Sequence, residues 1–125
     1  MACADWDPFT FDFQITCRYD IKPMYWYSIR FFEEDEFSDG EWITQTFEES
    51  FAPGTISRTF RGAMDGDEIL SEGYEASAVI DHDCTGNGDP VKFWINFRKV
   101  CEIGKPCYIQ HHVDLTNQDK SYAVL

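Results

Sequence analysis

The chain has few basic residues and no long apolar run. Ten Lys and Arg stand against 23 Asp and Glu, so the formal net charge is −13. A protein of that sign repels phosphate backbones, and we therefore expect no nucleic-acid partner. An anionic membrane is disfavoured for the same reason unless a cation bridges the two surfaces. No stretch approaches the roughly 18 apolar residues of a transmembrane helix, so we expect no transmembrane segment.

Zinc-binding spacing is also absent, although cysteine is plentiful. The 125 residues include five cysteines, yet no C-x-x-C pair occurs and the three histidines are not placed as partner ligands. Disulfides formed in an oxidising compartment explain the cysteines better. The start, "MACADWDP", lacks the basic and apolar parts of a signal peptide. We interpret the sequence as the mature form of a secreted, extracellular protein with Met1 added for expression. A cytosolic protein with free core cysteines stays the alternative.

Aromatic residues and alternating patterns predict an all-β fold. The aromatic fraction is 17%, with eleven Phe, six Tyr and four Trp, and such residues favour half-buried pleated surfaces. Residues 24–32 are apolar on both faces, as a central strand of a sandwich would be. Apolar residues alternate with polar ones, as in strands with one buried face, in three further stretches: 9–17, 74–82 and 91–97.

Seven to eight short strands at near-regular spacing predict a single β-sandwich domain over residues 1–125. The expected type is transthyretin-like or immunoglobulin-like. The acids of residues 65–73 suit a helix N-terminus and predict one short helix there. Residues 1–8 and 117–125 are expected to be loose termini.

The stretch "AVIDHDCTGNGD", residues 78–89, admits three interpretations, of which the first is a phosphatase nucleophile. Asp81, Asp83 and Thr85 form D-x-D-x-T after an apolar strand, which resembles the haloacid dehalogenase superfamily. In that family the first Asp attacks phosphorus and the second handles the leaving group's proton. The chemistry needs a parallel sheet, and the chain shows no strand–helix alternation to build one. A hydrolase or phosphatase is therefore the least favoured function, and we expect no catalytic residues.

The second interpretation of this stretch is a calcium site. Asp81, Asp83 and Asp89 follow the early positions of an EF-hand loop, but Lys92 stands where the bidentate Glu belongs and flanking helices are missing. A looser, C2-like site remains open if the acidic loops 65–68 and 81–89 converge. Calcium is thus the one cofactor considered, and solvated loop acids are the simpler explanation of these residues.

The third interpretation makes Cys84 half of a disulfide. A bridge to Cys17 would tie the first strand to the end of the fifth, and closing so long a loop is worth about 4 kcal/mol. An immunoglobulin domain makes a similar link, but His82 stands where its conserved tyrosine belongs. Cys101 and Cys107 enclose "EIGKP", a plausible tight hairpin bridge. Cys3 is then left unpaired or forms an intermolecular bridge. It could also take the place of Cys107 in the second disulfide.

"IDHDC", residues 80–84, resembles the I-x-H-x-C motif of the nematode transthyretin-like family. "ITC" at 15–17, "IRFFEED" at 29–35 and "TFRG" at 59–62 are similar to other segments of that family. The Pro-Tyr that usually precedes the motif is Ala76-Ser77 here, and Cys3 looks extra. The resemblance implies a secreted β-sandwich of the transthyretin type that acts by binding. The Tyr-Arg-Gly-Ser end that marks the hydrolase branch is absent, since the chain ends "SYAVL". His82 is expected to bond a neighbouring backbone group.

Two features suggest where a partner would bind. Residues 33–49 hold eight acids and no Lys or Arg, which could steer a basic partner or simply keep a hairpin edge from aggregating. The tryptophans exceed what one core face can use, so an exposed aromatic patch is expected around Trp42 or Trp94. The predicted partner-binding residues are Trp42, Trp94, Glu33, Glu34, Asp35 and Glu36.

The sequence as a whole predicts a secreted extracellular binding module that recognises a protein or small ligand and does no catalysis. A calcium-dependent, C2-like binding domain is the alternative. The sequence names neither the ligand nor the oligomeric state.

Overall fold

The computed structural model describes residues 6–34, 41–65, 73–116 and 123–124. These residues form strands and turns and no helix, and none of them belongs to a helix that could cross a membrane. The strands, in chain order, are β1 (Trp6–Cys17), β2 (Tyr25–Glu33), β3 (Glu41–Trp42), β4 (Phe47–Phe51), β5 (Gly54–Asp65), β6 (Gly73–His82), β7 (Val91–Glu102), β8 (Cys107–Asp114) and β9 (Ala123–Val124).

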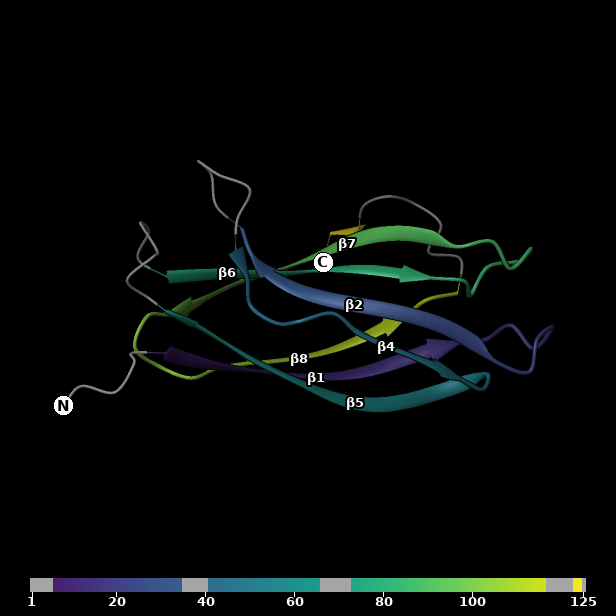
Figure 1. Ribbon diagram of the computed structural model, residues 1–125, viewed down its shortest axis with the longest axis horizontal. Coiled ribbons are helices and arrows are strands. Elements are labelled where there is room, and N and C mark those ends of the chain that lie inside the picture. The colour runs from purple at the N-terminus through teal and green to yellow at the C-terminus, as the bar shows by residue number, and fades with distance from the viewer. Residues whose placement is uncertain (1–5, 35–40, 66–72, 117–122, 125) are drawn as a thin grey trace.

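The strands form two sheets that face each other as an open sandwich (Figure 1). Sheet A has the order β5-β1-β8, with β1 antiparallel to β5 and parallel to β8. Sheet B has the order β3-β2-β6-β7-β9, and β4 also pairs with β2. Apart from the two-residue strands β3 and β9, seven strands lie three in one sheet and four in the other. The predicted all-β sandwich is confirmed.

The core lies between the sheets and is built from the alternating faces that the sequence predicted. Phe11 of β1 stacks on Phe31 of β2, with ring centroids 3.8 Å apart, and Phe13 meets Phe31 edge-on. Aromatic pairs of this kind add to the stabilisation from buried apolar area. The alternating residues of β1 and β6 are all buried: Phe9, Phe11, Phe13, Ile15, Cys17, Tyr74, Ala76, Ala78, Ile80 and His82.

The predicted loose N-terminus, 1–8, is wrong for its last three residues. β1 begins at Trp6, and Trp6, Asp7 and Pro8 pair with the end of β5. Asp7 is held because its buried carboxylate accepts hydrogen bonds from the Tyr74 hydroxyl of the opposite sheet and from the Gly104 amide.

Two further predictions fall partly on residues that the structure does not describe. At the C-terminus, residues 123–124 form β9 beside β7, and 117–122 and 125 lie outside the described residues. The predicted helix at 65–73 falls largely outside them too, since Asp65 ends β5 and Gly73 begins β6.

Two disulfides link the sheets at opposite ends of the sandwich. Cys17 at the end of β1, in sheet A, bonds Cys84 just after β6 of sheet B, with Cα atoms 6.0 Å apart. Cys101 of β7, in sheet B, bonds Cys107 of β8 in sheet A, with Cα atoms 5.6 Å apart. Both predicted pairings are confirmed, Cys3 lies outside the described residues, and the two disulfides indicate an oxidising environment.

Backbone contacts link the sheets beside β3. The Ile43 amide donates to the Phe31 carbonyl of β2, and the Ile43 carbonyl accepts from the Ala63 amide of β5. Gly62 makes this approach feasible, because a Cβ at that position would lie 2.3 Å from the Ile43 oxygen. The "TFRG" segment therefore ends in glycine for a packing reason.

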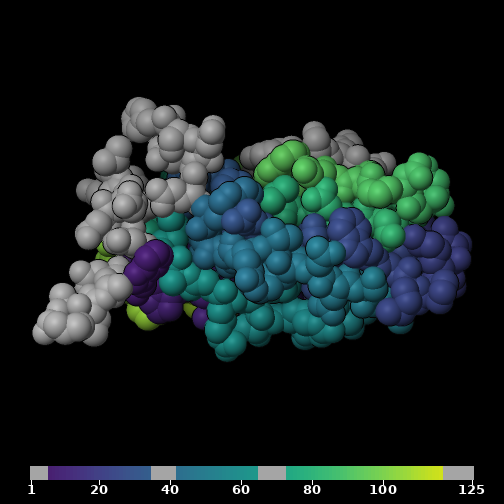
Figure 2. All heavy atoms as spheres, in the orientation of Figure 1, coloured from purple at the N-terminus to yellow at the C-terminus, as the bar shows by residue number. Residues whose placement is uncertain are grey.

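Further along the same side, one carboxylate joins three strands. Glu49 of β4 accepts hydrogen bonds from the Arg58 guanidinium of β5 at 2.8 and 3.0 Å and from the Tyr27 hydroxyl of β2 at 2.6 Å. The bonds from Arg58 and Tyr27 hold the pKa of Glu49 below its usual value. Burial and the adjacent Glu49 raise the pKa of Tyr27. Atoms in the colours of β4 and β5 lie across the middle and lower part of the molecule in this view (Figure 2).

Replacing each disulfide by two alanines should cost different amounts of stability. The bridges close loops of 67 and 6 residues, so loop entropy predicts losses of about 4 kcal/mol for C17A/C84A and about 2 kcal/mol for C101A/C107A. Urea unfolding of both double variants measures the difference. Equal losses, or more than one reactive thiol in the unfolded, unreduced wild type, would contradict this assignment.

Glu49→Gln should destabilise the protein in a pH-dependent way. The folded pKa of Glu49 is lowered, so its contribution is complete above the unfolded pKa of about 4.3 and is lost as pH falls through the folded pKa. We expect a loss of about 0.5–1 kcal/mol at neutral pH, because the pair is partly exposed, and none near pH 2. Urea unfolding at both pH values checks this. Glu48→Gln is the matched control, and an equal effect of both variants would refute the role of Glu49.

Candidate functional site

His82 and Cys84, the two specific residues of the I-x-H-x-C motif, have a structural role. The His82 side chain is fully buried, and its Nδ1 accepts the Cys84 amide at 3.0 Å. Its ring also meets the Phe93 ring edge-on, with centroids 5.6 Å apart. The expected bond from His82 to a neighbouring backbone group is thereby confirmed. The imidazole fixes the turn that presents Cys84 to Cys17.

The three predicted calcium ligands each have a separate partner. Asp83 accepts the Trp26 amide at 2.8 Å and the Lys22 ammonium at 3.0 Å. Asp81 lies 3.9 Å from the Lys92 ammonium, and Asp89 accepts the Asn87 side-chain amide at 3.1 Å. Across the described ranges, no three His, Cys, Asp or Glu side chains gather in a way that could hold a metal ion.

Of the other acidic loop in the calcium alternative, 65–68, only Asp65 belongs to the described residues. Asp65 and Gly73, which flank residues 66–72, lie at the end of the sandwich where β6 begins. Residues 83–89 follow the other end of β6, and a ten-residue strand is about 30 Å long. Asp65 and residues 83–89 thus lie at opposite ends of β6. The calcium alternative is decided by thermal unfolding with and without calcium.

The phosphatase-like motif lacks its required setting. β6, which carries Asp81, is antiparallel to both neighbours, β2 and β7, whereas that chemistry needs a parallel sheet. The Thr85 hydroxyl donates to the Asp89 carbonyl at 2.9 Å and so closes the turn. This stretch is a strand end followed by an internally bonded turn.

The predicted acidic partner site is wrong in one part. Glu33 is only 3% exposed, and its Oε2 accepts the Glu75 amide at 3.4 Å, so it does not face a partner. The register of β2 decides this, because Glu33 shares the inward parity of Phe31. Glu34 accepts the Asn96 side-chain amide at 3.0 Å, and Asp35 and Glu36 lie outside the described residues.

Trp42 and Trp94, by contrast, lie on one surface. The residues next to them in the chain, Ile43, Phe93 and Ile95, are buried. Because successive side chains of a strand point to opposite faces, both tryptophans are on the outer face of sheet B. Between them lie Arg30 and Val79, which are register partners of each other, as Val79 is of Trp94. Phe32 pairs with Trp42. We call this surface the tryptophan face; it comprises Arg30, Phe32, Trp42, Val79 and Trp94, and spans four strands, or about 14 Å.

The tryptophan face is held in one arrangement by contacts around Arg30. The guanidinium lies over the Trp42 ring, 3.8 Å from its centroid, and its Nε donates to the Thr44 carbonyl at 3.0 Å. The Trp42 ring also meets the Phe32 ring edge-on at 5.8 Å. Trp42 is nevertheless 51% exposed. A cation–π pair that is fixed yet open to solvent can contact a partner with little loss of side-chain entropy.

Sequence reasoning identified the tryptophans and missed Arg30 and Val79. The outward parity of Arg30 was readable from the alternation of residues 29–32. Its position between the two tryptophans depends on how β2 pairs with β3 and β6, and no local pattern encodes that register.

No family model, curated protein or solved structure matches this chain. The structure shows a small two-sheet all-β sandwich with two disulfides, and it assigns no family.

Calcium should not stabilise this protein, because both carboxylate oxygens of Asp83 already have protein partners. We expect equal melting temperatures in EDTA and in millimolar calcium. Asp83→Asn should lower the melting temperature equally in both, while Asp89→Asn, at an exposed turn, serves as the control. A rise of several degrees in calcium that Asp83→Asn abolishes would instead support the calcium alternative.

Proposed function

We propose that this protein is a secreted extracellular binding module, without catalytic activity, that recognises a protein partner through the tryptophan face. The observation that carries the proposal is the exposed Trp42 ring with the Arg30 guanidinium stacked on it. Trp94 lies on the same face, with β2 and β6 between the two tryptophans. Trp and Arg are the residue types most enriched among those that dominate the binding energy of protein interfaces.

The fixed geometry of this surface supports the proposal. Arg30 is restrained by Trp42 and by the Thr44 carbonyl, and Val79 and Trp94 belong to the regular part of sheet B. Side chains that are ordered before binding lose less entropy on association. The four-strand width suits a patch at the centre of an interface.

The overall charge indicates the kind of partner. A net charge of −13 raises the encounter rate with a basic protein and repels acidic ones. The charge would speed the encounter, and the Trp and Arg side chains of the tryptophan face would provide most of the binding free energy. We therefore propose a partner with a net positive charge and an apolar contact patch.

The resemblance to the nematode transthyretin-like family is part of the proposal. It is supported by the two-sheet sandwich, by the Cys17–Cys84 bridge at the I-x-H-x-C motif and by the packing role of Gly62 in "TFRG". Such a resemblance implies a secreted protein that acts by binding.

The experiment compares partner binding by variants that lack one of two tryptophans of similar exposure, Trp42 and Trp6. Trp6, 56% exposed, lies on sheet A, away from the tryptophan face. Immobilised wild type, W42A and W6A are incubated with extracellular fluid from the source organism, and the affinity of the main captured protein is measured for each. Truncating a central interface tryptophan to alanine costs about 2 kcal/mol or more of binding free energy, so W42A should bind about 30-fold more weakly. W6A should bind like wild type.

Equal binding by W42A and W6A would refute the tryptophan face as the contact surface. Capture of no protein at near-physiological salt would refute the protein-binding function. Thermal unfolding of both variants confirms that each one is folded.

A further inference from the structure

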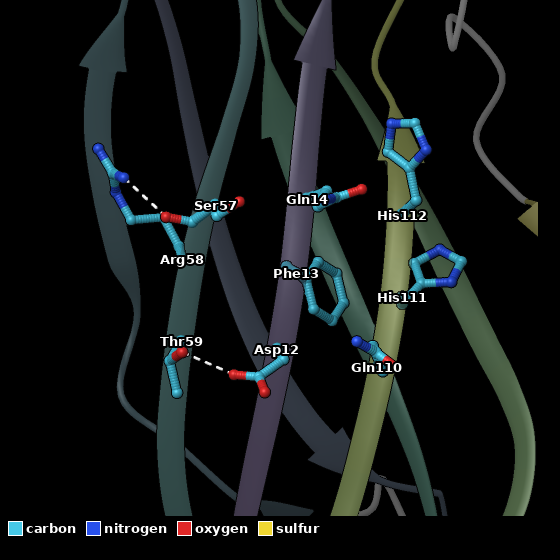
Figure 3. Close-up of a pocket in the computed structure, with 9 residues that line it drawn as sticks. All are labelled: Asp12, Phe13, Gln14, Ser57, Arg58, Thr59, Gln110, His111 and His112. Carbon is cyan, nitrogen blue, oxygen red and sulfur yellow. Dashed lines mark hydrogen bonds between the residues drawn. The ribbon is translucent and has the colours of Figure 1, made fainter.

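A groove of about 490 Å³ lies on the outer face of sheet A (Figure 3). The tryptophan face is on the other sheet. It runs over β1 between β5 and β8. The side chains that point outward into it are Asp12, Gln14, Ser57, Thr59, Gln110 and His112. Their parity is opposite to that of the buried Phe13, Phe60 and Ile109.

The register places these side chains in two adjacent rows. Asp12 of β1 is the partner of Thr59 on β5 and of Gln110 on β8. Gln14 is likewise the partner of Ser57 and His112. Side chains in one row of a sheet are direct neighbours, so each row presents three polar groups side by side across the three strands.

Two hydrogen-bonded trios fix the ends of the groove. At one end the Asp12 carboxylate accepts hydrogen bonds from the Thr59 hydroxyl at 2.6 Å and from the Tyr108 hydroxyl. At the other end the Thr16 hydroxyl bonds the Thr55 hydroxyl at 2.7 Å and His112 Nε2 at 2.8 Å. Each trio spans all three strands, so the walls of the groove are ordered before any ligand binds.

Between the trios lie three polar side chains whose hydrogen-bonding groups are open. Gln14, Ser57 and Gln110 are exposed and have no side-chain hydrogen bond to any described residue. Each glutamine offers two donor hydrogens and an accepting oxygen, and the serine hydroxyl both donates and accepts. A ligand here meets donors and acceptors in nearly equal supply.

The charge of the groove narrows the class of ligand. In a protein of net charge −13, Asp12 is the one carboxylate among these six outward residues, and it already has two protein donors. Hydrogen bonds from Thr59 and Tyr108 keep its pKa lowered. Arg58 is paired with Glu49 on the other side of β5. The groove thus lacks a cluster of unpaired cations of the kind that a phosphate or sulfate group requires, and the six side chains that point into it are all polar.

The strand order argues against an extended peptide as ligand. Peptides commonly add to a sheet through backbone bonds at an exposed edge, but the groove is centred on β1, whose backbone is paired with β5 and β8 on its two sides. β5 and β8 are the edge strands of this sheet, but over β1 itself only side chains are available to a ligand, and these favour a molecule dense in hydroxyl groups. The 48% exposed Tyr108 ring stands beside Asp12 and offers an apolar surface for packing.

We propose that this groove is a binding site for a neutral saccharide, whose hydroxyl groups bond Gln14, Ser57 and Gln110 and whose ring packs near Tyr108. The site is shallow and open, so it takes part of an extended oligosaccharide chain rather than an enclosed monosaccharide. It is separate from the tryptophan face, and neither site requires the other.

The test uses side-chain amide signals of glutamine in ¹⁵N–¹H NMR spectra of the wild-type chain. The probes are neutral hexasaccharides of glucose, N-acetylglucosamine, mannose and galactose, each added to millimolar concentration, and a heparin hexasaccharide as the anionic control. We expect at least one neutral probe to shift the Gln14 and Gln110 side-chain signals and to leave those of Gln45, on the far side of the molecule, in place. The anionic probe should shift none of them.

Variants make the assignment specific. Q14A and Q110A should each weaken binding of the active probe about fivefold, because each removes side-chain hydrogen bonds of ordinary strength. Gln45 is also exposed, so Q45A is the matched control and should bind like wild type. Unchanged melting temperatures show that the variants are folded.

Three results would overturn the proposal: no shift with any neutral probe, shifts only with the anionic probe, or wild-type affinity in Q14A and Q110A. Shifts confined to residues of sheet B would do the same, since they would place the saccharide on the tryptophan face.

Discussion

The attachment of one sheet to the other at both ends is the constraint on which the rest of this structure depends. Cys17–Cys84 and Cys101–Cys107 each join a strand of sheet A to a strand or strand end of sheet B. Between them the rings of Phe11, Phe13 and Phe31 fill the interior. Buried groups beside each bridge hold it in place: His82 accepts the Cys84 amide at one end, and Asp7 bonds Tyr74 and Gly104 at the other. Bridges at opposite ends restrict sliding and rotation of the sheets.

Because the interior is fixed in this way, the two outer faces are free to differ in chemistry. The face of sheet B carries aromatic rings and a stacked guanidinium, which suit a protein surface. The face of sheet A carries amides and hydroxyls in rows, which suit a neutral polar ligand. Among the described acids of residues 33–49, Glu33 is buried and Glu49 holds Arg58 and Tyr27, so neither is available to a partner. The negative charge therefore acts at long range, through the field of the whole molecule.

Much of the fold could be predicted because a strand with one buried face repeats every two residues. Phe9 to Cys17 and Tyr74 to His82 show that period clearly, and both sets are buried as expected. The Cys101–Cys107 bridge was predictable from a short spacing. The candidate sites were harder to predict from the sequence. Glu33 looked like a surface acid because of its acidic neighbours, and no pattern in the sequence marked the outward residues of β1, β5 and β8.

The sequence by itself determined the all-β class and the inward residues of the clearly alternating strands, because periodicity and aromatic content are local or additive properties. Only the tertiary structure decided which outward residues meet. Arg30 lies between Trp42 and Trp94, and Gln14 between Ser57 and His112, because of strand order and register. The physical reason is that a strand's own pattern specifies which face is buried, whereas its neighbours are chosen by the packing of the whole core.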